Sequence, residues 1–268
     1  MKNYVAVIMD LRASKKMKPE ERQRCQEKLG RVLALVNDIY GSYMVSKAEF
    51  SAGDSIQTLF TELDEALNFM FCVQKFMYPF QLDAGLGIGD LYVHVENEGS
   101  NAQDGPCYHY ARKALESCGS VARAACLSED ETSMKFLNNL LFVLYALQYD
   151  QTKKQRDLNN LLDITYPIAD IEYEHAAYAD NIHLYIKENI TTYNIQGISD
   201  LTDKSVLLEW GQNGQKIGTN WASLASKLLG TTYENIRQMI AAGNLQLIRL
   251  QKLMCLTFVL QYLPKEEG

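Results

Sequence analysis

The sequence predicts a mixed α/β domain followed by a largely helical region. Three observations favour this fold class. A short β-branched apolar run stands near the N-terminus and ends in an acid, strand-like and helix-like segments alternate over residues 1–127, and longer apolar helical segments follow from residue 128. Segments with period 2 and period 3.6 that alternate along a chain indicate a sheet covered by helices.

The first elements follow from apolar spacing and turn residues. Residues 5–8 predict a buried strand that ends at Asp10, and Pro19 opens a helix with an apolar stripe at spacings of three and four. Residues 44–50 and 56–60 predict two strands joined by a turn at 51–54. We expect the strand that follows this helix to pair with the first strand in the middle of the sheet.

The next segments complete a β-α-β-β-α-β order. Residues 63–77 predict a helix and residues 80–89 a strand, which together give the split arrangement of ferredoxin-like folds. A helix at 108–118 that carries Arg112 and a strand at 121–126 are expected to follow. We divide the chain into an α/β domain at 1–127, a helical connecting region at 128–200 and a helical segment at 201–268.

Composition excludes several classes of protein. The chain has 268 residues, of which 47% are hydrophobic and 22% charged, as in ordinary globular proteins. Its apolar stretches are too short to cross a bilayer and it begins without a secretory signal, so we expect a cytoplasmic protein with no membrane partner. A net charge of -7 disfavours nonspecific coating of nucleic acid. The six cysteines and four histidines lack metal-ligand spacing.

Two aspartates are the candidate metal ligands. Asp10 ends the first strand and Asp54 lies in the hairpin turn, so the topology is expected to bring both carboxylates to neighbouring strand ends. Magnesium prefers carboxylate oxygens and shares its other positions with water and phosphates. The loop at 12–16, with Ser14 and Lys15, offers backbone N–H groups and positive charge to those phosphates. The alternative is that both acids are ordinary strand-end and turn residues.

Several short motifs follow one another in the first half of the chain. They are VIMDLRAS at 7–14, FSAGDSIQ at 50–57, GLGIG at 85–89, DGP at 104–106 and ARKALE at 111–116. Together these motifs resemble the SatD family of bacterial proteins. The resemblance covers roughly residues 4–118 in order. That family is in turn similar to class III nucleotide cyclases and diguanylate-cyclase-like palm domains, so the resemblance implies a cyclase-like fold for the first domain.

The resemblance also implies roles for particular residues. Asp10 and Asp54 would bind Mg²⁺ or Mn²⁺ on a nucleoside triphosphate, with the Leu11 carbonyl as a further ligand and Gln57 in the nucleotide site. Arg112 would stabilise the transition state. Two positions depart from these patterns, because Tyr108 stands where cyclases have an asparagine and Met9 where SatD proteins usually have glycine. Alternatively, Arg112 forms an ion pair with Glu116 on an exposed face of the helix.

The C-terminal segment fits a helix-turn-helix template between residues 221 and 243. Gly230 would take a left-handed conformation at the turn, and Thr231 or Thr232 would cap the second helix. In that helix, at 233–241, the outward residues Asn235, Arg237 and Gln238, with Thr232, would contact specific DNA. The alternative is a protein-binding or purely structural unit. The apolar helix at 245–263 suggests a homodimer.

Three functions remain open from the sequence. The first is a regulator in which a nucleotide bound to the α/β domain alters how the C-terminal helices engage DNA or a partner. The second is an active metal-dependent nucleotidyl cyclase or nucleotidyltransferase that releases pyrophosphate. The third is an interaction scaffold that kept the fold and lost the chemistry.

Overall fold

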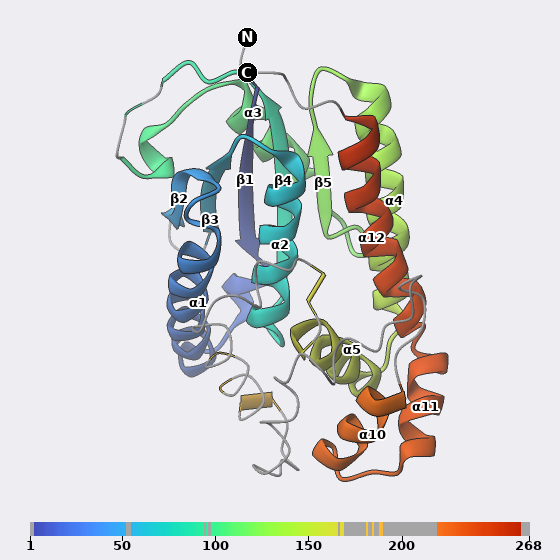
Figure 1. Ribbon diagram of the computed structural model, residues 1–268. Helices are drawn as coiled ribbons and strands as arrows, with labels where there is room; N and C mark the ends of the chain where they lie inside the picture. Colours follow the sequence, from blue (N-terminus) through green and yellow to red (C-terminus); the bar gives the residue numbers. More distant parts are fainter. Residues whose placement is uncertain are drawn as a thin grey trace. The chain divides into compact units, whose positions relative to one another are not determined.

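Figure 1 shows the computed structural model of the chain. The structure describes residues 3–51, 55–93, 95, 98–165, 167–168, 181, 184, 188–189 and 219–263. The chain divides into two compact units, one formed by Met1–Tyr145 with Met254–Gly268 and the other by Ala146–Leu253.

The first unit contains a five-stranded mixed sheet. Its strands are β1 (Tyr4–Leu11), β2 (Met44–Ser51), β3 (Ser55–Phe60), β4 (Leu82–Gly89) and β5 (Ala124–Leu127). They lie in the order β2-β3-β1-β4-β5, with β4 and β5 parallel and the other neighbours antiparallel. The expectation that β2 pairs with β1 is wrong, because β3 takes that place and leaves β2 at the edge.

Helices cover both faces of this sheet. They are α1 (Pro19–Tyr40), α2 (Leu63–Met77), α3 (Pro106–Glu116) and α4 (Glu131–Tyr149). The elements from β1 to β4 therefore follow the predicted order. In Figure 1, α1 and α2 lie in front of the sheet and α3 behind it. The α3 face buries Ala6, Ile8 and Leu59 against Cys107 and Ala111.

On the opposite face, aromatic rings join the sheet to α1 and α2. The ring of Phe69 lies 5.4 Å from that of Phe60 and 6.0 Å from that of Tyr40, centroid to centroid. All three side chains are buried. Burial of large aromatic side chains supplies much of the stabilisation in a core of this size.

Two glycines in β4 let α3 approach the sheet closely. A Cβ atom on Gly85 would collide with the backbone of Ala111 and Leu115, and one on Gly87 with the backbone of Cys107 and Ala111. Both positions face α3, so glycine is required there by space.

The side chain of an asparagine pairs with each edge strand. On β2, Asn37 of α1 donates to the carbonyl of Ala48 at 2.8 Å and accepts from its N–H at 2.9 Å. On β5, Asn138 of α4 accepts from the N–H of Cys126 at 2.7 Å and donates to its carbonyl at 2.9 Å. Each amide therefore occupies both backbone groups of one edge residue.

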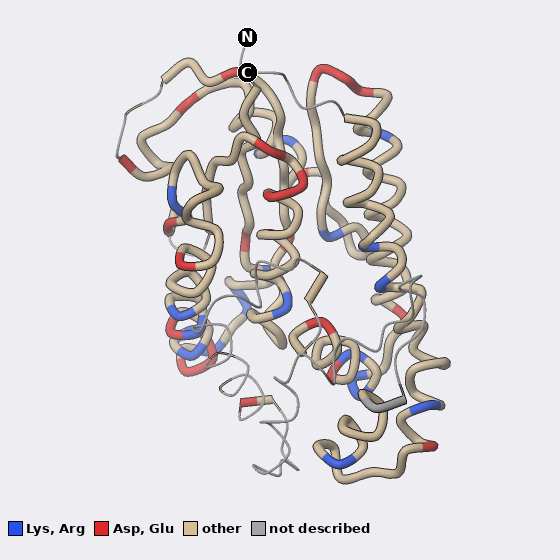
Figure 2. Tube along the Cα trace, viewed as in Figure 1, with Lys and Arg blue, Asp and Glu red and all other residues tan. Residues whose placement is uncertain are grey.

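The helix α12 (Leu245–Tyr262) begins in the second unit and ends in the first. Within the first unit its Phe258 ring lies 4.8 Å from the Phe136 ring of α4 and 5.7 Å from that of Tyr262. Long uncharged stretches run along α4 in Figure 2. No helix in the described part of the chain is long and apolar enough to span a membrane.

The second unit is helical in its described part. Its helices are α5 (Lys153–Thr165), α10 (Thr219–Leu228), α11 (Tyr233–Ala242) and the first half of α12. The indole N–H of Trp221 donates to Oγ1 of Thr165 at 2.9 Å. Lys252 of α12 forms a buried ion pair with Asp163 of α5, at 2.5 Å between Nζ and Oδ2.

The turn between α10 and α11 has the predicted local conformation. Gly230 has φ 58°, and the Thr232 side chain caps α11 by accepting from the N–H of Asn235 at 3.2 Å. In α11, Ile236 is fully buried and Met239 is half-buried.

Candidate functional site

The candidate site lies at the end of the sheet where β1 ends and β3 and β4 begin. Asp10 is exposed and stands opposite Ser55 of β3 on one side and Asp83 of β4 on the other. Residues opposite one another in an antiparallel pair project from the same face of the sheet. That face is the one covered by α3, because Ile8, two residues earlier in β1, packs against α3.

Asp54, the second predicted metal ligand, lies outside the described residues. It immediately precedes Ser55, the cross-strand neighbour of Asp10. Within the described residues, no group of three or more histidine, cysteine, aspartate or glutamate side chains is arranged to hold a metal ion. The metal ligation predicted for Asp10 and Asp54 therefore stays a prediction.

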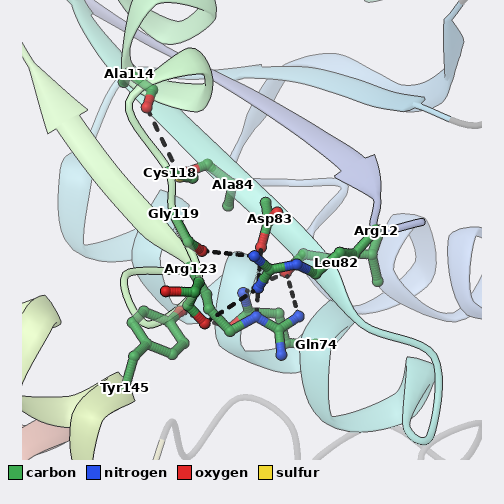
Figure 3. Close-up of polar contacts among 11 residues, drawn as sticks. Arg12, Gln74, Leu82, Asp83, Ala84, Ala114, Cys118, Gly119, Arg123 and Tyr145 are labelled. Atoms are coloured by element: carbon green, nitrogen blue, oxygen red, sulfur yellow. Dashed lines mark hydrogen bonds and ion pairs between the residues drawn. The ribbon is translucent and has the colours of Figure 1, made fainter. Parts of the chain in front are cut away.

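Asp83 is held by two arginines, as Figure 3 shows. Its Oδ1 atom lies 3.8 Å from Nη1 of Arg12 and 3.4 Å from Nε of Arg123. The side chains of Asp83 and Arg123 are each 18% exposed, and that of Arg12 is 31% exposed. Burial lowers the pKa of the Arg123 guanidinium, and the negative charge of Asp83 opposes this effect.

Arg12 also fixes the turn that follows α3. Its Nη2 donates to the carbonyl of Gly119 at 2.7 Å, and its Nη1 donates to that of Ser120 at 3.4 Å. The sequence placed this residue in a loop that offers charge to phosphates. The structure instead commits the Arg12 guanidinium to the protein itself.

The rest of that loop is at least partly exposed. Ala13 has φ 57° and leads into a short 3-10 helix, η1 (Ser14–Lys16). Lys15 is exposed and Ser14 is half-buried. The loop therefore presents the Lys15 side chain to solvent close to the end of β1.

Two other predicted nucleotide residues lie in the sheet. Gln57 of β3 is 9% exposed, and its Nε2 donates to Oγ of Ser51 in β2. The side chain of Leu11 is buried opposite Leu82. Any part that Leu11 plays would therefore come from its backbone, as the resemblance implies.

Two residues of α3 were singled out from the sequence. Arg112 is exposed. Arg112 and Glu116 both belong to the described part of the chain and form no ion pair with each other, so the alternative of an i,i+4 pair is not supported. Tyr108 is 6% exposed, and its hydroxyl shares a hydrogen bond of 2.6 Å with Oγ of Ser100. Burial raises the pKa of Tyr108 above its ordinary value, so the hydroxyl stays neutral.

Sequence reasoning missed the residues that surround Asp83. Asp83 and Arg123 are 40 residues apart, and their pairing arises only when β4 and β5 lie side by side. Nearby, the Tyr145 hydroxyl donates to Oε1 of Gln74 at 2.8 Å. Burial raises the pKa of the Cys118 thiol to about 11. Cys118 is therefore a neutral thiol and a poor nucleophile. The only sequence signal for this cluster was the acidic Asp83 near the start of the strand predicted at 80–89.

The predicted DNA-contacting residues belong to the second unit. Thr232, Asn235, Arg237 and Gln238 are all exposed on or beside α11. Nη1 of Arg237 lies 3.3 Å from the Tyr233 hydroxyl, and Nδ2 of Asn235 donates to Oγ1 of Thr231 at 2.7 Å. These local bonds order the two side chains at the helix surface.

Comparison with known proteins identifies the family. No curated protein matches the chain. A comparison with protein families matches residues 4–190 to the SatD family. The match continues beyond the motifs near the N-terminus and includes α4 and α5, while α10 and α11 lie after its end. Because the family match covers more than half of the chain, this chain belongs to the SatD family.

Proposed function

We propose that the first unit binds a nucleoside triphosphate together with Mg²⁺ or Mn²⁺ at the strand ends beside Asp10. The observation that supports this best is the register of β1 and β3, in which Asp10 stands opposite the residue after Asp54. A carboxylate from each of two adjacent strand ends suits a cation that shares its coordination sphere with phosphates.

The sheet supports a fold of the ferredoxin-like, nucleotide-cyclase-like type. Its first four strands lie in the order β2-β3-β1-β4, and within these four each strand is antiparallel to the next, as the split β-α-β-β-α-β arrangement requires. Exposed Lys15 and Lys16 follow Asp10 within six residues and add positive charge for phosphates. Figure 2 shows basic and acidic segments alternating at the start of α1, which comes next.

The biological role proposed is regulation: nucleotide binding changes how α10 and α11 engage DNA or a protein partner. Tyr108 favours binding over turnover, because its neutral hydroxyl is buried and bonded to Ser100 where an orienting amide is expected. The alternative is an active cyclase or nucleotidyltransferase, in which exposed Arg112 would be available to stabilise the transition state. Pyrophosphate release from any of the four nucleoside triphosphates with Mn²⁺ would favour that alternative.

The metal–nucleotide site is tested by Asp10→Asn and Asp54→Asn. At a ligand concentration of about 100 times Kd, binding stabilises a protein by roughly 2.7 kcal/mol. We expect Mn²⁺ with one of the nucleoside triphosphates to raise the Tm of the wild type by about 5 °C or more. Each variant should lose most of this shift, because it removes one charged ligand. Differential scanning fluorimetry measures both.

The matched control is Asp150→Asn, which removes an exposed carboxylate outside the site. It should leave the shift unchanged. The proposal would be contradicted if no nucleoside triphosphate shifted the wild type, or if both site variants kept the full shift.

Contact of α11 with DNA is the second part of the proposal, and Arg237→Ala tests it. If Arg237 reads a base edge, its loss should weaken binding to a selected DNA site by about 1–3 kcal/mol. The measurement is fluorescence anisotropy on a duplex selected from a random pool, at several salt concentrations. Lys154→Ala, which removes an exposed charge from α5, should cost much less. If both variants weakened DNA binding equally, the proposal that α11 contacts the base edges would be contradicted.

A further inference from the structure

We propose that this chain forms a homodimer through an apolar face of its first unit, made by α4 and by α12 from Met254 onward, which packs against the same face of a second copy. We call this surface the α4–α12 face. The sequence suggested self-association through the helix at 245–263 alone, and the structure adds α4 to it. The proposal concerns a partner of the chain and does not depend on the nucleotide site.

Two neighbouring helices form the α4–α12 face. Figure 1 shows α12 beside α4, and the rings of Phe136 and Phe258 meet across the two helices at 4.8 Å between centroids. The inward sides of both helices are already buried, at Leu137 and Leu141 of α4 and at Val259 of α12. Large apolar residues occur on the outward sides as well. A helix that is apolar on all sides is usually covered on all sides.

The exposed apolar area of the face is large for a monomer. Six of its residues are between 44% and 68% exposed, namely Phe136, Phe142 and Val143 of α4 and Met254, Leu260 and Tyr262 of α12. Since a large side chain presents roughly 150–250 Å² when it is fully accessible, the six together expose on the order of 600 Å². Apolar patches of this size mark interaction sites. Two copies would bury roughly 1,200 Å² of apolar area between them, which reaches the range of a specific interface.

The chemistry of the face favours a second copy as its occupant. No aspartate, glutamate, lysine or arginine occurs in residues 136–145 or 254–262. The exposed polar side chains in these two ranges include two amides and a hydroxyl, those of Asn139, Gln261 and Thr257. Amides and hydroxyls both donate and accept hydrogen bonds, so they can pair with groups of their own kind across a two-fold axis, where like charges would repel each other. A partner with a charged surface would instead bury its charges without counter-charges.

Sedimentation velocity over about 1–100 µM protein tests the proposal. The wild type should be a dimer at the upper end of this range. Val143→Glu on α4 and Met254→Glu on α12 should each weaken dimerisation at least about 100-fold, because each places an unpaired carboxylate from both copies in the interface. The matched control is Tyr92→Glu, which makes the same kind of change at a residue that is 74% exposed and lies outside both helices. It should leave the dimer intact.

Salt and folding provide two further readouts. Raising NaCl from about 50 mM to about 500 mM should leave the dimer unchanged or strengthen it, because the face carries no charge and the salt screens the repulsion between two chains of net charge -7. Far-UV circular dichroism of both glutamate variants should match that of the wild type, since the two residues are exposed before substitution. If one variant fails to fold, the other tests the same face from the second helix.

Three outcomes would overturn the inference. A wild type that stays a monomer at about 100 µM would leave the face to a different protein. A dimer that persists in a folded glutamate variant would locate the interface elsewhere on the chain. A dimer that dissociates as salt is added would indicate an interface made by ion pairs, which the α4–α12 face does not offer.

Discussion

Replacement of Gly87 by alanine is expected to lower the free energy of unfolding by about 3 kcal/mol, because an added Cβ has no space between β4 and α3. The atoms that it would meet are backbone atoms of Cys107 and Ala111, which cannot rotate away as a side-chain end can. Relief would require α3 to move off the sheet and to loosen its packing on Ala6 and Ile8. Urea denaturation followed by circular dichroism measures the loss.

The matched control for this substitution is Gly30→Ala. Gly30 lies in the middle of α1, is exposed, and has no atom within 4 Å of the place of an added Cβ. Alanine there should raise the free energy of unfolding by about 0.5–1 kcal/mol, because glycine is a poor residue within a helix. Changes of the same sign for both glycines would contradict the packing of α3 on β4.

Replacement of Lys252 by methionine is expected to destabilise the chain by about 3–5 kcal/mol. The Lys252 and Asp163 side chains are 7% and 6% exposed, so the substitution leaves a carboxylate without its cation in the interior of the second unit. A solvent-exposed carboxylate would lose far less, since water replaces its partner. Fluorescence of buried Trp221 during urea denaturation reports on this unit.

Two further variants separate burial from charge in this prediction. Lys153→Met removes the cation from an exposed pair with Asp157 on α5, at 3.0 Å and with the lysine side chain 80% exposed, and it should cost under about 0.5 kcal/mol. Lys252→Met combined with Asp163→Leu should regain most of the loss, because no buried charge then remains unpaired. A double variant as unstable as Lys252→Met alone would show that shape outweighs charge there.

Features that depend on neighbours in the chain could be predicted from the sequence. The left-handed Gly230 and the cap at Thr232 follow from a few adjacent residues, and the structure confirms both. The strand that ends near Asp10 was predicted for the same reason, since a β-branched apolar run is a local signal. Family membership was also predicted from short motifs and is confirmed.

Features that depend on distant partners could not be predicted in the same way. Arg12 was expected to face phosphates, yet its carbonyl acceptors lie 107 and 108 residues later in the chain. The partners of Asp83 come from two different strand ends, and no local pattern indicates either. Pairing of β1 with β3 and not β2 is likewise a property of the assembled sheet.

The asparagines that pair with β2 and β5 have a consequence for how other chains can approach. An exposed strand edge with unpaired backbone groups is a template on which another chain can add a strand. At Ala48 and Cys126 the backbone N–H and carbonyl are already bonded to asparagine side chains of α1 and α4. An added strand would therefore find neither a donor nor an acceptor at these two residues. Addition of a further strand is therefore obstructed at these two positions on the flanks of the sheet.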